Sequence, residues 1–410
     1  MTSVINEIVA YNSGRDPERL RLKFARMAES PFVFLRGSCH LFYRRLPNAP
    51  VLVDAPPAWC CGDLHLENFG SFRGDDQQVY FDMNDFDEAA LAPCTWDPVR
   101  LLVSLVLAAR EVELPWDLTL DLGRSFVDIY AAALADGKAR WVDRETSKGL
   151  VRKVFDDLRK CKRRKFLDQR TRLKHRRRSL RIDGRKALPA SEGQCTAVGS
   201  LIESVTRDRP NPAFYRVLEV ARRISGTGSL GVDRYVILVE GKGSPNGNYL
   251  LDLKQTLPST LSSRLEQAQP HWLNEASRAV SIQQRVQAVS PAFLQAVEFN
   301  GTSYVLRALQ PSEDRISLER ARGKPSRLQA LIRTLAISKT KGFKVKDIAA
   351  GVKKVKAGKT VAAGFKPVAA KAGKAAAVST KELLGAVNAG MLSASAVSKV
   401  LVVQDAVLQK

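Results

Sequence analysis

Two short stretches in the first quarter of the chain carry the side chains that phosphoryl transfer requires. In the first, Cys61–Gly70, Asp63 precedes Asn68 by five positions, and in the second, Val79–Glu88, an apolar run ends in Asp82. When ATP is the donor, one carboxylate orients the attacking hydroxyl, while an amide and a second carboxylate hold the Mg²⁺ that bridges the phosphates. The spacing therefore predicts Asp63 as the catalytic carboxylate and Asn68 and Asp82 as magnesium ligands.

Five further polar residues surround these stretches. Asp85 is a third candidate magnesium ligand, and Asp87 is available for a second ion. His65 lies inside the first loop, where it either lines the site or is a structural histidine. Asp97 and Arg100 open an apolar run that is typical of a core helix, so we expect them to brace the catalytic lobe without taking part in chemistry.

The two stretches resemble the catalytic and metal loops of kinase-like phosphotransferases, especially the branch of aminoglycoside phosphotransferases and choline kinases. They resemble still more closely a large bacterial family, domain of unknown function 2252, whose members carry GD-H-NFG, FD-NDFDE and WD-RL. In this chain the three motifs are Gly62–Gly70, Phe81–Glu88 and Trp96–Leu101. The resemblance covers about residues 15–335 and implies a kinase-like fold. One departure is Cys61, which replaces a histidine that braces the loop in kinase-like relatives.

A glycine-rich turn much later in the chain is the candidate phosphate loop. Gly226, Gly228 and Gly231, with Ser229 among them, precede the β-branched and aromatic run Arg234–Glu240. Such turns let backbone N–H groups approach phosphate oxygens. The common alternative, a dinucleotide-binding turn, leads into a helix. Because a strand pattern follows Gly231, the sequence favours a hairpin of the kind found over the phosphates in kinases.

The next predicted strand ends in Lys254, which we expect to contact the phosphates of ATP. An unpaired ammonium at the end of an apolar run would be costly, although a surface hairpin with an exposed lysine is the alternative. Residues 262–289 have a helical pattern. We expect a carboxylate on this helix, Glu275 or else Glu266, to pair with Lys254.

The order of these parts predicts an α+β, two-lobed kinase-like fold whose lobes are circularly permuted. The catalytic loop comes first and the phosphate loop second, and strands at 293–298 and 302–306 lead into the hinge that would receive the adenine. The predicted units are a mainly helical catalytic and metal lobe, a basic helical insertion, an antiparallel-sheet lobe with the phosphate loop, and a largely disordered Lys/Ala-rich tail. They span residues 1–150, 151–210, 211–337 and 338–410.

The net charge of +23 is concentrated in two segments. Residues 152–186 hold 17 Lys and Arg against four Asp, and residues 339–410 hold 14 Lys against three acidic residues. The first predicts a basic helix with a loop that captures nucleic acid or another anion. A solvated helical hairpin is the alternative, because only Phe155 and Phe166 could stack on bases. The second contains low-complexity Lys/Ala/Gly stretches, which cannot bury enough apolar surface to order themselves.

The remaining composition favours a cytoplasmic protein without a membrane segment. Six cysteines lie without a Cys-x-x-Cys pair, the N-terminus shows no secretory pattern, and no apolar run reaches about 18 residues. The leading hypothesis is an ATP- and Mg²⁺-dependent phosphotransferase that acts on a hydroxyl of a small substrate. The alternatives are an enzyme that transfers AMP, a non-catalytic kinase-like protein, and a protein that binds nucleic acid or anions through its basic segments.

Overall fold

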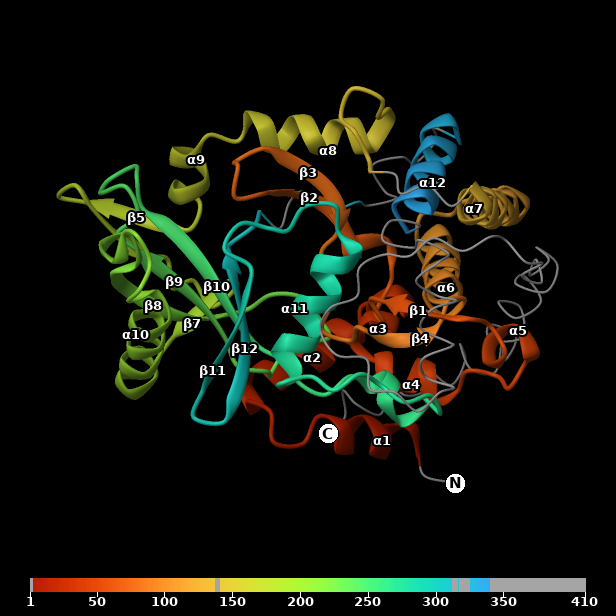
Figure 1. Ribbon diagram of the computed structural model, residues 1–410, viewed down its shortest axis with the longest axis horizontal. Coiled ribbons are helices and arrows are strands. Elements are labelled where there is room, and N and C mark those ends of the chain that lie inside the picture. Colours follow the sequence, from red (N-terminus) through yellow and green to blue (C-terminus); the bar gives the residue numbers. More distant parts are fainter. Residues whose placement is uncertain (1–2, 137–140, 312–315, 317–324, 340–410) are drawn as a thin grey trace.

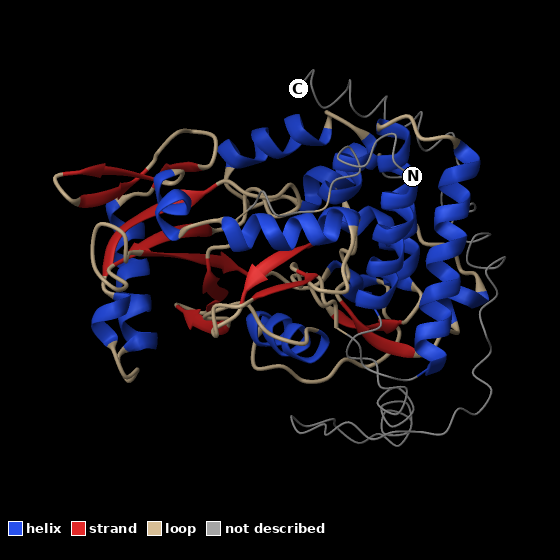
Figure 2. Ribbon diagram, turned by 90° about the horizontal axis from the view of Figure 1, so that it is seen from above, coloured by secondary structure: helices blue, strands red, loops and turns tan. Residues whose placement is uncertain are grey.

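The chain folds into a mainly helical half and a half built on one large sheet, which lie side by side (Figure 1). The structure is a computed structural model that describes residues 3–136, 141–311, 316 and 325–339. Seen from above, the strands gather at one side and the long helices at the other (Figure 2). The α+β class predicted from the sequence is therefore confirmed. The predicted tail lies outside the described residues, except for its first two positions.

The helical half contains the first eight helices, the last helix and four short strands. Its elements are α1 (Val4–Tyr11), α2 (Pro17–Met27), α3 (Pro31–Gly37), α4 (Cys39–Arg44), α5 (Pro50–Val53), β1 (Pro57–Cys60), β2 (Phe69–Arg73), β3 (Val79–Met83), β4 (Ala90–Pro93), α6 (Trp96–Glu111), α7 (Trp116–Asp136), α8 (Gly149–Lys160) and α12 (Pro325–Lys339). The strands form two antiparallel pairs, β1–β4 and β2–β3. Helix α6 is almost wholly buried and forms the centre of the core, as its apolar sequence predicts.

The sheet half consists of six antiparallel strands with helices on both faces and a separate two-stranded hairpin. Its elements are α9 (Arg163–Asp168), β5 (Thr171–Lys174), β6 (Arg177–Leu180), β7 (Ala187–Pro189), α10 (Glu192–Thr206), β8 (Val217–Arg223), β9 (Arg234–Val239), β10 (Tyr249–Gln255), α11 (Glu275–Val286), β11 (Gln295–Phe299) and β12 (Thr302–Ala308). The strand order is β11-β12-β10-β9-β8-β7. The strands predicted after the glycine-rich turn and at the final hairpin are confirmed.

Along β10, successive side chains point to opposite faces of the large sheet. One face is apolar, and the other carries both apolar and charged side chains. Leu251 and Leu253 pack in one cluster with Ile202 of α10, whereas Leu250 packs in a different cluster. Because successive side chains of a strand point to opposite faces, Asp252 and Lys254 share the face opposite α10. Both side chains are buried. The sheet thus carries two buried charged side chains, those of Asp252 and Lys254, on the face opposite α10.

Two predicted boundaries differ in the structure. The segment expected to be a basic helix with a loop contains α8 and α9 but continues as the hairpin β5–β6 and then as β7, which joins the large sheet. Thr171, Arg178 and Leu180 are buried, whereas the charged residues at the tip of the hairpin, Arg172, Lys174, Arg176 and Arg177, are solvent-exposed, and this division explains the hairpin. The sheet half therefore begins before residue 211. The helix expected over 262–289 is limited to α11, whose first turn is capped by Asn274.

The last described helix returns to the helical half. Leu328, Leu331 and Leu335 of α12 are buried in the same core as Phe126 of α7 and Val151 of α8. The unit predicted over residues 211–337 is therefore not continuous in space, because its end completes the first half. In the part of the chain that the structure describes, no helix is both long enough and apolar enough to cross a membrane.

Candidate functional site

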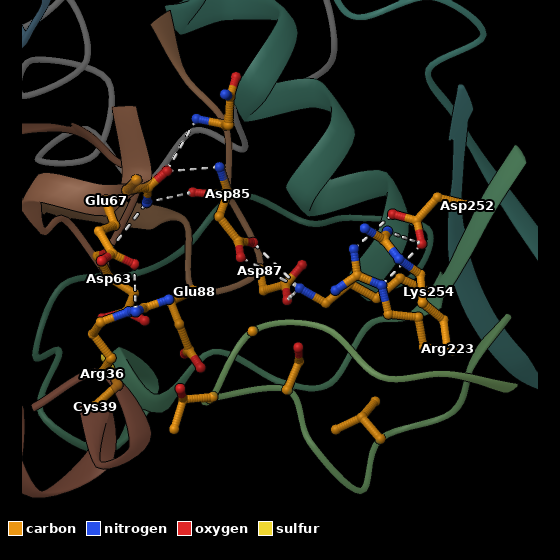
Figure 3. A pocket seen from close by; sticks show the side chains of 18 of the residues that line it. Arg36, Cys39, Asp63, Glu67, Asp85, Asp87, Glu88, Arg223, Asp252 and Lys254 are labelled. Atoms are coloured by element: carbon orange, nitrogen blue, oxygen red, sulfur yellow. Dashed lines mark hydrogen bonds and ion pairs between the residues drawn. The ribbon is translucent and has the colours of Figure 1, made fainter. Parts of the chain in front are cut away.

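A pocket of about 120 Å³ lies where the two halves meet (Figure 3). Asp63 and Lys254 both line it, although they come from opposite halves of the molecule. The order of the motifs predicts that the catalytic loop, Asp82 and Lys254 face one cleft; the structure confirms this for Asp63 and Lys254 but not for Asp82, which does not line the pocket. Gly226, Gly228 and Ser229 also line the pocket.

The loop that carries Asp63 is held rigidly by one face of α6. Asp97 accepts hydrogen bonds from the backbone N–H groups of Cys61 and Gly62, at 2.9 and 3.0 Å. Ser104, two turns further along the helix, accepts one from the backbone N–H of Leu66 at 3.2 Å. The bracing role predicted for Asp97 is confirmed, whereas Ser104 was not anticipated. Its spacing of seven residues from Asp97 is the signal that could have indicated it.

Gly62 occupies a position that only glycine can take. Its φ is +83°, and a Cβ at this residue would lie 2.1 Å from the carbonyl oxygen of Glu88. The close approach brings the Asp63 loop directly against the segment Asn84–Glu88 that follows β3, which we call the acidic segment. The glycine before the candidate catalytic carboxylate is therefore a steric requirement of the fold.

Asp63 forms an ion pair with Arg100, whose side chain is fully buried. The guanidinium donates from Nε and Nη2 to the same carboxylate oxygen, Oδ1, with the Nε contact at 2.8 Å, and Nη2 also donates to the Leu35 carbonyl. The second oxygen, Oδ2, is turned toward the glycine-rich loop, since a Cβ on Gly228 would lie 4.0 Å from it. Arg100 thus braces Asp63 itself, a contact that the sequence did not indicate, and leaves one carboxylate oxygen directed at the pocket.

The amide of Asn68 ties the two predicted loops together. Its Nδ2 donates to the carbonyl oxygens of Asp63 and Asp85, at 3.1 and 3.2 Å, and its Oδ1 accepts from the backbone N–H groups of Asn84 and Asp85, at 3.0 and 2.8 Å. The oxygen expected to bind magnesium is therefore used by the protein itself. Asn68 acts as a positioning residue in this structure, which differs from the predicted metal ligand.

Asp82 does not join the predicted metal site. It is 2% exposed and is not among the residues that line the pocket, and its Oδ1 accepts from the backbone N–H of Met83. The sequence correctly places it near the end of a strand, but its buried side chain does not line the pocket. Asp85 and Asp87, further along the same segment, line the pocket in its place.

Lys254 is held by carboxylates from the opposite half of the molecule. Its Nζ forms an ion pair with Asp87 and lies 3.3 Å from Oδ1 of Asp85. The prediction that Glu275 pairs with Lys254 is wrong, because Glu275 pairs with Arg278 on its own helix at 2.6 Å. Burial and the neighbouring charge of Asp85 raise the pKa of Asp87 above its ordinary value, against the opposing effect of Lys254.

Of the carboxylates that line the pocket, Asp85 and Asp87 are the pair beside Lys254 that could hold a metal ion. No group of three His, Cys, Asp or Glu side chains that could hold an ion occurs among the described residues. Magnesium in nucleotide sites is commonly held by one or two protein carboxylates together with phosphate oxygens and water. The pair therefore fits an ion that arrives with phosphates, once Lys254 has turned from these carboxylates.

The glycine-rich loop is clamped from behind by helix α2 and by Arg15, which lies two residues before the helix. Gly226 and Gly231 have φ of +74° and +87°, and the loop carbonyls face the basic side chains of α2. The donors are Arg15 and Lys23 to Gly228, Arg26 to Gly226, and Arg19 to Val232, at 2.8 to 2.9 Å. Because the carbonyl oxygens are bound on this side, the loop is fixed against the pocket.

This basic face of α2 was missed by the sequence analysis. Arg15, Arg19, Lys23 and Arg26 recur at helical spacing, which is the pattern that could have indicated it. Lys23 is fully buried, and burial together with Arg15 holds its pKa well below the ordinary value.

The remaining predicted residue, His65, lines the pocket and lies edge-on to Phe32.

A cluster of three arginines around one aspartate forms the end of the pocket next to Lys254. Asp252 accepts from Arg234 at 2.9 and 2.6 Å and from Arg223 at 2.7 Å, and Arg307 lies 3.6 Å from it. All four side chains line the pocket and come from adjacent strands. We call Arg223, Arg234 and Arg307 the arginine cluster. In the sequence, the one indication of this cluster is that Asp252 and Lys254 lie two positions apart on a strand and therefore share a face of the sheet.

Comparison with known proteins identifies the family. No curated protein and no solved structure matches the chain. One family model, described as "Uncharacterized protein conserved in bacteria (DUF2252)", matches residues 15–372. The match extends beyond the region expected from the motifs, which ended near residue 335, and so includes about half of the Lys/Ala-rich tail. Since it covers most of the 410 residues, the chain belongs to this bacterial DUF2252 family.

Proposed function

We propose that the protein is an ATP- and Mg²⁺-dependent phosphotransferase that transfers a phosphorus-containing group to a hydroxyl of a small acceptor. The observation that carries this proposal is the single pocket shared by Asp63, the glycine-rich loop and Lys254. Transfer of the terminal phosphoryl group is the reaction of kinase-like sites. Transfer of AMP is the alternative that the same parts allow.

The arrangement of the sheet half supports the proposal. The glycine-rich loop joins β8 to β9, Lys254 lies on β10, and α11 packs beside β11 and β12. A glycine-rich loop over the phosphates, followed by a strand that carries the lysine and then by a helix, is the order of parts in protein kinases. In this chain these parts follow the catalytic loop, which corresponds to the permuted order expected from the sequence.

The chain's own residues suggest how the transfer proceeds. Oδ2 of Asp63 accepts the hydrogen bond of the acceptor hydroxyl and orients its oxygen, while Arg100 holds the other carboxylate oxygen. Lys254 exchanges its carboxylate partners for phosphate oxygens. When magnesium is bound with the nucleotide, it neutralises part of the phosphate charge, and Asp85 and Asp87 are the residues that would hold it.

The pocket must widen to admit a nucleotide. Its volume of about 120 Å³ is below the roughly 300–1,000 Å³ of ordinary ligand pockets. The ion pairs of Lys254 with Asp85 and Asp87 join the two halves across this space. Their replacement by phosphate and metal contacts provides a physical reason for opening on ligand entry.

A thermal-shift titration of the full chain with ATP and Mg²⁺ tests nucleotide binding, and consumption of ATP with a panel of hydroxylated compounds tests the reaction. The informative variant is the double substitution Asp63→Asn with Arg100→Met, because it removes the carboxylate without leaving a buried unpaired cation. We expect it to bind nucleotide but not to consume it. Absence of any stabilisation by millimolar Mg–ATP would refute the proposal.

A second candidate function, binding of nucleic acid or another polyanion, is favoured by the tip of the β5–β6 hairpin. Arg172, Lys174, Arg176 and Arg177 are all exposed there, while Arg178 is buried and pairs with Asp168. Replacing the four exposed residues by Ser should reduce affinity for duplex DNA and flatten its salt dependence. Unchanged affinity in this variant would exclude the hairpin as the binding surface.

A further inference from the structure

Among the residues that the structure describes, the arginine cluster carries more positive charge than its ion-pair partners neutralise. Three guanidinium groups surround the single carboxylate of Asp252, and Lys254, on the same face, is shared with Asp85 and Asp87. Even with all three carboxylates ionised, these seven groups leave one positive charge in excess. Figure 3 shows that Arg223, Asp252 and Lys254 lie together at one end of the pocket, with Asp63 and Arg36 at the other.

Within the cluster it is the charge of Arg223 that is unfavourable in the absence of a ligand, because at Arg234 the effect of burial is outweighed by Asp252, which raises the pKa of that guanidinium. Burial lowers the pKa of Arg223 to about 9, with a further contribution from Arg234, and Asp252 opposes this shift. Buried charges are ordinarily paired, since an uncompensated one costs several kcal/mol. Because the cluster lines a pocket, an anion that binds there can supply the missing negative charge.

The chemistry of the lining also indicates which part of a nucleotide fits here. The sheet strands contribute only charged or polar side chains to the pocket: Arg223, Arg234, Asp252, Lys254, Gln255 and Arg307. A nucleobase requires mainly apolar walls with a few polar contacts. Guanidinium groups, by contrast, form paired hydrogen bonds with phosphate oxygens. The hinge-side position that the sequence analysis assigned to adenine is therefore occupied by groups that favour phosphate.

We propose that the arginine cluster is a phosphate site that receives the terminal phosphates of the nucleotide, so that the ligand enters phosphate-first and its base lies outside the cluster. The identity of the ligand as a nucleotide rests on the proposed function, whereas the phosphate site itself stands on the charges and the lining of the pocket.

Phosphate-first binding determines the reaction. With the β- and γ-phosphates at the arginine cluster, the α-phosphorus is the centre nearest Asp63. The acceptor oxygen then forms a bond to this phosphorus, and the bond from the α-phosphorus to the bridging oxygen breaks. Pyrophosphate leaves with that oxygen, and the hydroxyl proton passes to solvent by way of Asp63. Of the two transfers considered above, this orientation selects transfer of AMP.

Calorimetric binding of sodium tripolyphosphate and of adenosine to the full chain tests the site. We expect tripolyphosphate to bind and adenosine to give no measurable heat. Arg223→Met should weaken tripolyphosphate at least tenfold, and Arg307→Met is a second variant with the same expected effect. The matched control is Arg216→Met, because Arg216 precedes the same strand but is exposed and pairs with Glu240; it should leave the affinity unchanged.

The outcomes separate the two proposals. If Mg–ATP binds but neither cluster variant weakens tripolyphosphate, the phosphate site is refuted and the proposed function stands. If tripolyphosphate binds through Arg223 but ATP does not, the phosphate site stands and the nucleotide function is refuted. Binding of adenosine that Arg223→Met strengthens would place the base at the cluster and overturn the inference. ATP turnover should release pyrophosphate, and ADP as the sole product would overturn the orientation.

Discussion

At the scale of single residues, Asp63 serves both the site and the fold. Its partner Arg100 has no exposed surface, so the carboxylate that could orient a hydroxyl also neutralises a buried cation. Loss of activity on substitution of Asp63 alone would therefore not show a role in chemistry. Stability and activity have to be measured together.

We predict that Asp63→Ala lowers the free energy of unfolding by about 3–5 kcal/mol, because it leaves the Arg100 guanidinium buried without a counter-charge. The double variant Asp63→Asn with Arg100→Met should recover most of this loss. Urea unfolding of the three proteins measures the effect. Equal destabilisation in the single and double variants would show that the ion pair does not account for it.

Two substitutions in the arginine cluster should have opposite effects on stability. Asp252→Asn removes the only carboxylate among three guanidiniums and should lower the free energy of unfolding by several kcal/mol. Arg223→Met relieves repulsion and should leave the stability equal or higher. Thermal unfolding without ligand distinguishes them. A marked loss of stability in Arg223→Met would mean that the cluster is balanced and holds no excess charge.

The pH dependence of stability provides an independent check on Arg223. A base whose pKa is lowered to about 9 in the folded protein, from an ordinary value near 12.5, binds its proton less tightly in the folded state than in the unfolded state. The unfavourable contribution of Arg223 to the stability should therefore diminish as the pH increases above 9. The advantage of Arg223→Met at neutral pH should shrink over the same range, as measured by chemical unfolding.

At the scale of elements, the contact between α2 and the glycine-rich loop determines the loop's shape. Four basic side chains from Arg15 to Arg26 bind its carbonyl oxygens, and the backbone N–H of Asp16 donates to Gly231 at 3.0 Å. A phosphate loop in a free hairpin would be mobile. Here a helix from the other end of the sequence keeps it in place.

Gly231→Ala should destabilise the protein by at least 1–2 kcal/mol, the approximate cost of a left-handed conformation for a residue with a side chain. The residue has φ of +87°, and its new Cβ would lie 2.9 Å from Cβ of Arg15. Gly199→Ala is the matched control, since Gly199 lies within α10 and nothing is within 4 Å of an added Cβ. The control should be stabilising by roughly 0.5–1 kcal/mol. Similar effects of the two changes on thermal unfolding would contradict the strained geometry.

At the scale of the whole molecule, α11 connects the sheet half to the acidic segment of the helical half. Arg278 is buried and donates to the carbonyl oxygens of Asp87 and Leu257, at 2.8 and 3.1 Å, and to that of Ala89. One guanidinium thus holds the segment that positions Asp85 and Asp87 opposite Lys254. The alignment of the two halves depends on it.

We expect Arg278→Met to lower the free energy of unfolding by about 3 kcal/mol or more, because three backbone carbonyls lose their donor. Hydrogen exchange should increase in the segment around Ala89. Arg285→Met on the same helix is the control, as Arg285 lies over the ring of Trp59 at 5.7 Å, and we expect an effect below about 1 kcal/mol. Equal effects from both variants would argue against a specific link between the halves.

Local patterns in the sequence were sufficient for the elements and for part of the site. The strand that precedes the acidic segment, the core helix α6, the strands around the glycine-rich turn and the shared pocket of Asp63 and Lys254 were all predicted. These features depend on the alternation of apolar residues, on turn glycines and on motif spacing, which act over a few residues. The hairpin inside the basic segment was missed because its charges obscured two buried strand positions, Thr171 and Leu180.

The sequence by itself therefore determined most of the elements and indicated Asp63, the glycine-rich loop and Lys254 as candidate site residues. Only the tertiary structure decided their partners: Asp87 for Lys254, α2 for the glycine-rich loop, and three arginines for Asp252. The physical reason is that these contacts join residues far apart in the chain, and a buried charge pairs with whichever opposite charge the packed halves bring closest. Neither propensity nor periodicity contains that information.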